Sequence, residues 1–225
     1  MSLPRIDAYP LPSADDLPQG RVDWRPDPAR AALLVHDMQR YFLAPFERDA
    51  DPLRGVTANI AALLTECRNR DIPVFYTAQP GRQSPHDRGL LTEFWGDGIG
   101  SVIDTDPRAE DVVDELAPRP GEVRLTKWRY SAFQRSSFAE QLADRGRDHL
   151  LITGVYAHIG CQATAVEAFM RDVRPFLVAD AVADFSRRHH DQAVEYVAHR
   201  CGVALSTADV LTSVRTGDSV ARAAR

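Results

Sequence analysis

The sequence is poor in the features that mark several large classes of protein. Its 225 residues include only three cysteines, which are far apart and show no C-x-x-C spacing. An odd number of scattered cysteines argues against a disulfide framework and against a zinc site. We interpret Cys67 and Cys201 as buried core thiols.

Long apolar runs and blocks of basic residues are also missing. No stretch approaches the roughly 20 apolar residues of a membrane-spanning helix, and the N-terminus lacks the pattern of a secretory signal. We therefore expect a cytoplasmic protein with no membrane partner. The net charge is −5 and the isoelectric point is near 5.8, without a run of Lys or Arg, so we expect no nucleic-acid partner. A small anionic substrate would depend on local cations.

The length and composition suit one folded domain. Of the 225 residues, 44% are hydrophobic, which is enough to bury a core. Residues 1–30 are polar and proline-rich and predict an N-terminal arm that wraps this domain or a neighbouring subunit. We expect the domain itself to span residues 31–215 and a flexible tail to span residues 216–225. Residues 81–108 are rich in glycine and predict an irregular insertion, either a lid or a substrate loop.

Short apolar runs alternate with amphipathic stretches along the domain. The runs are nearly continuous, which is typical of strands covered on both faces of a parallel sheet. We therefore predict an α/β fold with a doubly wound, mostly parallel, six-stranded sheet and helices on both faces. The predicted strands are 31–38, 72–79, 123–128, 149–156, 175–184 and, more weakly, 202–207, and the predicted helices are 57–69, 137–144, 161–172 and 187–200.

Polar side chains end several of these strands. Asp37 ends the first, Gln79 the second, Lys127 the third and Tyr156 the fourth. Ligands of open parallel sheets bind beyond the carboxyl ends of the strands, so we expect these residues to lie near one edge. A buried acid needs a partner, and Lys127 is the obvious one for Asp37. Their pairing indicates either an internal salt bridge or a catalytic site, because charge pairing also tunes active-site pKa values.

The segment 153–165 joins a predicted strand to a predicted helix through a short turn at Gly160. Free N–H groups and the helix dipole favour negative charge at such a helix start. Enzymes often place a nucleophile or an oxyanion hole there. Gly160 is therefore either a simple turn glycine or part of a site.

A series of longer stretches carries a family likeness. They are LLVHDMQRYF (33–42), YTAQPG (76–81), RGLLTEFWGDG (88–98), LTKWRYSAF (125–133), TGVYAHIGC (153–161), PFLVADAVADFS (175–186) and HHDQAVEYVAHRC (189–201). Through them the sequence resembles the isochorismatase-like branch of the cysteine hydrolase superfamily. Within that branch it is most similar to the single-domain isochorismatases of phenazine pathways and to the isochorismatase domains of siderophore synthesis. The resemblance implies the doubly wound fold predicted above. It also implies a non-proline cis peptide bond at Val155–Tyr156.

The resemblance also bears on the catalytic residues. Amide-cleaving members use an Asp–Lys–Cys triad, and Asp37 and Lys127 match its first two members. Gly160 stands where the nucleophilic Cys would be. Cys161 follows one residue later, but one step along a helix start turns a side chain by about 100°, away from Asp37 and Lys127. Nicotinamidases hold a metal with an Asp and two His after the first strand. Residues 40–53 contain no His, and His189 and His190 are adjacent on a helix and poor co-ligands, so we expect no metal and no other cofactor.

The implied reaction is hydrolysis of the enolpyruvyl ether of isochorismate or of 2-amino-2-deoxyisochorismate, with release of pyruvate. A vinyl ether is cleaved after protonation of its terminal carbon, which needs an acid and a water but no thiol. We assign Asp37 as the general acid, with Lys127 moving to a substrate carboxylate. By the same resemblance, the substrate carboxylates are held by Gln79, Arg88, Tyr156 and the backbone of Gly160, and the ring is walled by Phe42, Trp95 and Tyr130.

Several alternatives remain at this stage. If Arg88 does not bind substrate, it is a solvated charge on a loop. If Phe42 and Trp95 do not wall the substrate ring, they are ordinary core residues. Two alternatives to ether hydrolysis remain for the whole protein. It could act as an amide or carbamoyl hydrolase that uses Cys161, or it could be an inactive paralogue that serves as a binding partner. The chain shows no carrier domain, which together with the match over 189–201 favours the amino substrate. Family members are usually dimers, so we expect a homodimer.

Overall fold

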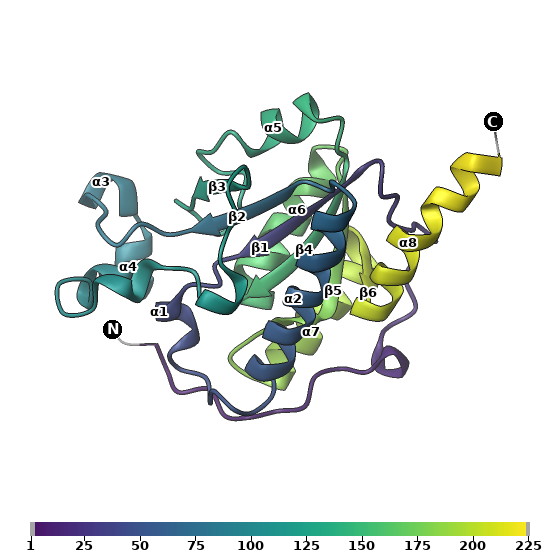
Figure 1. Ribbon diagram of the computed structural model, residues 1–225. Coiled ribbons are helices and arrows are strands. Elements are labelled where there is room, and N and C mark those ends of the chain that lie inside the picture. The colour runs from purple at the N-terminus through teal and green to yellow at the C-terminus, as the bar shows by residue number, and fades with distance from the viewer. Residues whose placement is uncertain (1–2, 224–225) are drawn as a thin grey trace.

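The structure is a computed structural model, which describes residues 3–223 and the side chains of residues 3–216. One six-stranded sheet forms the centre of the molecule (Figure 1). Its strands lie in the order β3-β2-β1-β4-β5-β6, and every neighbouring pair is parallel. The chain thus starts in the middle of the sheet and winds outward in both directions, so the doubly wound, six-stranded sheet is confirmed. The strands are β1 (Ala31–His36), β2 (Val74–Ala78), β3 (Val123–Thr126), β4 (His149–Val155), β5 (Arg174–Ala183) and β6 (Val203–Leu205).

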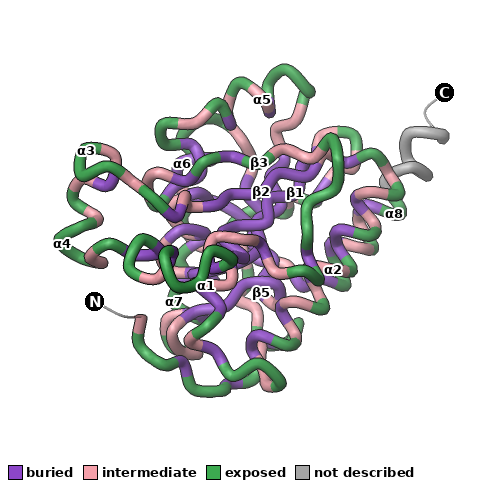
Figure 2. The backbone as a smooth tube through the Cα atoms, turned by 60° about the vertical axis from the view of Figure 1, so that its left-hand side comes forward, coloured by how far each residue is buried: buried purple, intermediate pink, exposed green. Residues whose placement is uncertain are grey.

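Helices cover both faces of the sheet, as predicted. Leu33 and Val35 of β1 face one core cluster, which α2 (Leu53–Asn69) and α8 (Thr207–Ala223) cover, and Ala32 and Leu34 face the other. That second cluster lies under α5 (Phe138–Asp144), α6 (Gln162–Met170) and α7 (Arg187–Arg200). Every residue of β1, β2 and β4 is buried, which explains the near-continuous apolar runs. Figure 2 shows the buried strands enclosed by exposed connections.

Helix boundaries follow local capping chemistry only in part. The Ser186 side chain accepts a hydrogen bond from the N–H of His189 and caps α7. Helix α2 begins at Leu53 rather than at residue 57. Helix α6 begins at Gln162, after a wide helical turn over Ala157–Cys161. Ser137 precedes α5 but its side chain makes no capping hydrogen bond.

Helix α8 is not among the predicted helices, because polar residues dilute its apolar pattern. Val210 and Val214, four positions apart, are nearly fully buried against the sheet. The helix continues to Ala223, through most of the predicted tail 216–225. Side chains beyond residue 216 lie outside the described residues, so the flexibility of the tail stays a prediction.

The N-terminal arm lies on its own domain in the part that the structure describes. Ile6 pairs with Phe46 in an isolated parallel bridge, and its N–H donates to Pro45. The Tyr9 hydroxyl accepts a hydrogen bond from the backbone N–H of Asp184 at 2.8 Å. These contacts favour the first of the two roles that the sequence left open for the arm.

The insertion over 81–108 folds into short helices rather than one regular element. It contains α3 (Pro85–Arg88), α4 (Leu91–Trp95) and a 3-10 turn over Gly98–Ser101. Outside the insertion, a further short helix, α1 (Arg40–Leu43), begins four residues after the end of β1. The insertion lies beside the carboxyl ends of β2 and β3 in Figure 1.

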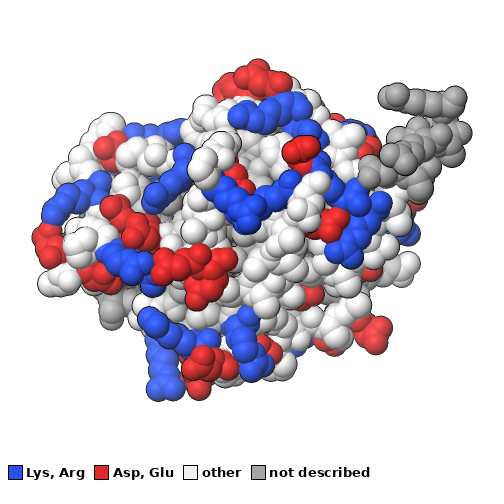
Figure 3. Space-filling view, in the orientation of Figure 1, with Lys and Arg blue, Asp and Glu red and all other residues white. Residues whose placement is uncertain are grey.

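None of the helices in residues 3–223 is both long and apolar enough to cross a membrane. Acidic and basic side chains are intermixed over the face shown in Figure 3.

Candidate active site

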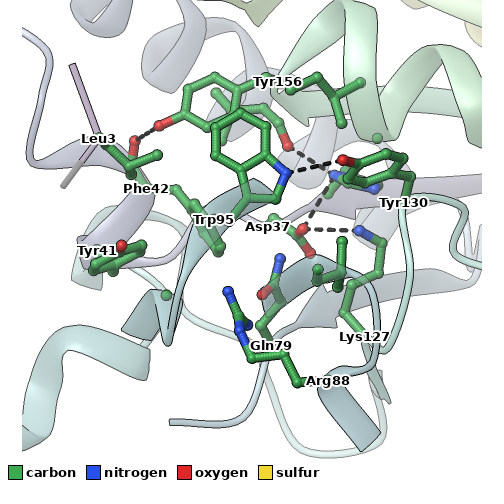
Figure 4. A pocket seen from close by; sticks show the side chains of 16 residues that line it. Leu3, Asp37, Tyr41, Phe42, Gln79, Arg88, Trp95, Lys127, Tyr130 and Tyr156 are labelled. Carbon is green, nitrogen blue, oxygen red and sulfur yellow. Dashed lines mark hydrogen bonds and ion pairs between the residues drawn. The ribbon is translucent and has the colours of Figure 1, made fainter. Parts of the chain in front are cut away.

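A cavity opens beyond the carboxyl ends of β1 and β4, where the order of strands reverses (Figure 4). This is the usual ligand position in a doubly wound sheet. Its empty space is about 590 Å³ counted with the open mouth. The structure brings all of the predicted site residues together around it: Asp37, Phe42, Gln79, Arg88, Trp95, Lys127, Tyr130, Tyr156 and Gly160.

Asp37 and Lys127 form an ion pair at the sheet edge. The Lys127 Nζ atom lies 2.9 Å from Asp37 Oδ2, and both side chains are almost fully buried. The Thr77 hydroxyl donates to Asp37 Oδ1 at 2.5 Å. The carboxylate is therefore held from two sides by neighbouring strands.

These partners decide the charge of the carboxyl group. Burial is the largest single influence on the pKa of Asp37 and raises it, but the Lys127 cation and the hydrogen bonds from Thr77 and Lys127 act against burial, and the net shift of the pKa is downward. Burial lowers the pKa of His36 to about 4. His36 is therefore neutral near pH 7, and Lys127 supplies the compensating positive charge. Without substrate, Asp37 is an anion, whereas a general acid must hold a proton.

Gln79 owes its position to a neighbouring glutamine. The Gln39 side-chain amide donates to the Gln79 carbonyl at 2.8 Å and accepts from the Gln79 N–H at 2.7 Å. Gln39 is fully buried. The pair of bonds fixes the backbone of Gln79, whose side chain faces the cavity beside Arg88 in Figure 4.

Arg88 is a buried cation that forms no ion pair within the described part of the chain, although the charge of Asp97 lies near enough to raise its pKa. It is only 6% exposed, so the reading as a solvated loop charge is wrong. Its Nε donates to the Gly96 carbonyl, and its guanidinium packs against Gly98, where a Cβ atom would lie 2.6 Å from Nη2. No ion pair joins Arg88 to a carboxylate among the described residues. Burial lowers the pKa of Arg88. A carboxylate ligand would compensate this charge.

Aromatic side chains form the opposite wall. Trp95 donates from Nε1 to the Tyr130 hydroxyl at 2.9 Å. Tyr156 stacks on Phe185 with ring centroids 4.2 Å apart. The Tyr156 hydroxyl donates to the backbone carbonyl of Phe42 at 2.7 Å, so it is not free to hold a substrate carboxylate as the resemblance implied. Phe42 belongs to the core and also lines the cavity.

The turn after β4 has the backbone that the resemblance implied. The Val155–Tyr156 peptide bond is cis. Gly160 follows in the wide helical turn, where its N–H donates to the Tyr156 carbonyl at 3.1 Å.

Cys161 does not line this cavity. It is fully buried in the second core cluster, and its Sγ lies 4.0 Å from the Thr153 carbonyl. Burial raises its pKa well above the ordinary value of a thiol. An inaccessible, protonated thiol is a poor nucleophile.

His36 is one of several residues that line the cavity and were not predicted as site residues. It is the last residue of β1 and lines the cavity beside Asp37. A histidine at the end of an otherwise apolar strand was the available signal.

A second cluster lies outside the cavity, where ligand atoms of His158, Asp184 and His189 all lie within 4.8 Å of one another. The rings of His158 and His189 stack with centroids 4.6 Å apart, so His189 meets His158 rather than its neighbour His190. The Asp184 carboxylate already accepts hydrogen bonds from the N–H groups of His158 and Phe185 and from the His158 ring. We interpret the cluster as a hydrogen-bonded turn. The absence of a metal stays a prediction.

A buried acid–lysine pair, a buried arginine and an aromatic wall define a pocket for a small anionic molecule on a doubly wound α/β fold. The profile of the isochorismatase domain matches residues 31–209. The chain belongs to the isochorismatase family.

Individual proteins agree with this assignment. The isochorismatase of Bacillus subtilis (strain 168) is 50% identical over 215 residues, which cover 96% of this chain and 68% of the relative. The phenazine biosynthesis protein PhzD1 of Pseudomonas aeruginosa is 48% identical over 210 residues, covering 93% of this chain and 98% of the relative. A cysteine hydrolase structure from Pseudomonas syringae pv. phaseolicola superposes with a TM-score of 0.75 at 22% identity, covering 89% of this chain and 98% of that one, and it shows the shared fold.

Proposed function

We propose that this protein hydrolyses the enolpyruvyl ether of isochorismate or of 2-amino-2-deoxyisochorismate. The products are pyruvate and either a trans-dihydrodiol acid or trans-2,3-dihydro-3-hydroxyanthranilate. The observation that carries the proposal is the Asp37–Lys127 pair, buried in a cavity that also holds Arg88 and presents no thiol. Relatives that are about half identical are named for isochorismate hydrolysis and for phenazine biosynthesis.

The chemistry requires one proton donor and one water. Asp37 transfers a proton to the terminal CH₂ carbon of the vinyl ether and leaves an oxocarbenium ion. Water adds to this cation and loses a proton, which returns to Asp37, and the hemiketal collapses to pyruvate and the ring alcohol. No covalent bond to the protein forms at any step.

Substrate binding has to protonate Asp37 first, because Asp37 is ionised in the free protein. A substrate with two carboxylates brings negative charge next to Asp37 and offers Lys127 a competing partner. Both changes raise the pKa of Asp37, which burial then keeps high. Arg88 holds a carboxylate, with the Gln79 side chain as a further donor, and the aromatic wall of Phe42, Trp95, Tyr130 and Tyr156 holds the ring. The Gly160 N–H already donates to the Tyr156 carbonyl, so it does not hold a carboxylate as the resemblance implied.

The test is pyruvate release, measured with lactate dehydrogenase as the coupling enzyme and each of the two substrates in turn. We expect turnover of at least one substrate and its loss by more than about 100-fold in Asp37→Asn, the usual scale of a lost general acid. The ratio of kcat/KM between the substrates identifies the preferred one, and we expect the amino compound. Release of no pyruvate from either substrate would refute the proposal.

We also propose a homodimer that acts in the cytoplasm and binds neither nucleic acid nor membranes. Light scattering after size exclusion measures the mass of the particle, and a value of twice the 25.0 kDa chain mass is expected.

A further inference from the structure

The imidazole of His36 is held in one place by its surroundings. Its side chain is 1% exposed, and its Nδ1 lies 2.8 Å from the Val155 carbonyl. A carbonyl only accepts hydrogen bonds, so Nδ1 carries the hydrogen and Nε2 carries the lone pair. Nε2 is buried without a hydrogen-bond partner among the described residues. The Tyr130 backbone acts only weakly on the ring, so hydrogen bonding at the second nitrogen adds little, and packing has to explain what the bond at Nδ1 does not.

That explanation is the contact with Gly160. A Cβ atom added to Gly160 would lie 2.1 Å from His36 Cε1 and 2.7 Å from Nε2. Both distances are far shorter than any real contact, so no side chain fits at position 160 while the ring stays. Gly160 is not among the residues with positive φ. The backbone therefore does not require glycine here, and the imidazole does.

The ring also has little room to withdraw. The backbone of His36 lies against Gly154, where an added Cβ atom would meet the His36 carbonyl oxygen at 2.1 Å. The bond from Nδ1 to Val155 fixes the ring from the same strand. His36 thus lies between two glycines, with Gly154 of β4 at its backbone and Gly160 of the following turn at its side chain.

We propose that His36 is a specificity-determining residue, whose ring occupies the space of a side chain at position 160 and so keeps a nucleophile out of the pocket. Position 160 lies at a helix start in the cavity that holds Asp37 and Lys127. A thiol there would have a cation and a carboxylate at hand. With His36 in place, the pocket is restricted to substrates that an acid and water cleave without a covalent intermediate, such as vinyl ethers. The inference deepens the proposed function, but its test needs no turnover.

A double-mutant cycle on thermal stability tests the contact. In Gly160→Ala, the added methyl group meets the ring, and we expect the Tm to fall by roughly 2–12 °C, as for overpacked cores in chains of this length. In the His36→Ala background, the same change should lower the Tm by less than half as much, because the ring is gone. Equal effects in both backgrounds would overturn the proposal.

His190 provides a matched control. It is also a fully buried histidine, and its Nε2 lies 2.8 Å from the Ala179 carbonyl, away from Gly160. Gly160→Ala should lower the Tm by the same amount in the parent and in the His190→Ala background. If Gly160→Ala alone cannot be obtained folded, folding of His36→Ala/Gly160→Ala supports the contact. Failure of that double variant, when His36→Ala alone folds, contradicts it.

The rate of thiol alkylation tests the consequence for chemistry. Iodoacetamide is added to Gly160→Cys and to His36→Ala/Gly160→Cys, and peptide mass spectrometry reads the modification of residue 160. The native thiols are all buried and give a low background. We expect residue 160 to react at least roughly 10-fold faster in the double variant, where the thiol can occupy the vacated space near Lys127. Equal rates, with Gly160→Cys as stable as the parent, would show that His36 excludes nothing.

Discussion

Replacing Lys127 by methionine removes the cation beside Asp37 and keeps a side chain of similar length. The Asp37 carboxylate is then buried with the Thr77 hydroxyl and without its ion-pair partner. Removing one member of a buried pair costs about 3–5 kcal/mol, because the remaining charge is uncompensated. For a chain of this size that is a fall in Tm of roughly 6–20 °C at pH 8.

The loss should depend on pH in a direction that the structure defines. In the parent, the pKa of Asp37 is lowered on folding. Its contribution to stability is therefore complete above the unfolded pKa, about 3.9, and disappears only as pH falls through the folded pKa. In folded Lys127→Met, burial raises the pKa of Asp37, so Asp37 is protonated at every pH below that raised pKa. Between the pKa of Asp37 in the unfolded chain and that raised pKa, the free energy of unfolding of the variant falls by about 1.4 kcal/mol for each unit that the pH increases.

Urea unfolding of both proteins at pH 5, 6, 7 and 8 measures this difference. We expect the deficit of Lys127→Met to be largest at pH 8 and to shrink toward pH 5. In the parent, folded His36, which also lies beside Asp37, has a pKa of about 4 and is neutral over this range. Lys127 is one of the groups that lower this pKa, so its removal raises the pKa of His36 and also makes the deficit smaller toward pH 5. The control is Asp37→Asn/Lys127→Met, which carries no charge at either position and should show a smaller and nearly pH-independent deficit. A deficit of Lys127→Met that is equal at pH 5 and pH 8 would refute the reasoning.

Other substitutions in the pocket separate substrate binding from stability. Arg88→Gln should raise KM by roughly 10–100-fold, the value of a lost charge-assisted hydrogen bond, with kcat changed less; an unchanged KM would place the substrate carboxylate elsewhere. Cys161→Ala should keep pyruvate release within about 3-fold of the parent, because the thiol is buried and protonated; loss of turnover in a folded variant would revive the amidase reading. Tyr156→Phe should lower the Tm by roughly 2–8 °C, since it leaves the Phe42 carbonyl unpaired, and a large rise in KM without a change in Tm would mean that the hydroxyl binds substrate instead.

Pattern and resemblance predicted which residues share the pocket, and packing explains why that worked. Asp37, Gln79 and Lys127 follow neighbouring strands, and parallel strands present their carboxyl ends at one edge. Arg88 and Trp95 come from the irregular insertion, which has no periodic pattern, so only the family likeness assigned them. Helix α8 escaped prediction because its apolar stripe is narrow and is defined by the sheet it covers rather than by its own composition.

By itself, the sequence determined the sheet, its order of elements and the identity of the acid, the lysine and the glycine at the turn. These follow from apolar runs, strand ends and short motifs, which are local in the chain. Tertiary structure alone decided the charge of Asp37, because Lys127 lies 90 residues away and pairs with it only in the fold. It also decided that the Tyr156 hydroxyl is committed to Phe42, and that the His36 ring occupies the space beside Gly160. Hydrogen bonding and excluded volume act between atoms that touch in space, and no spacing along the chain encodes those contacts directly.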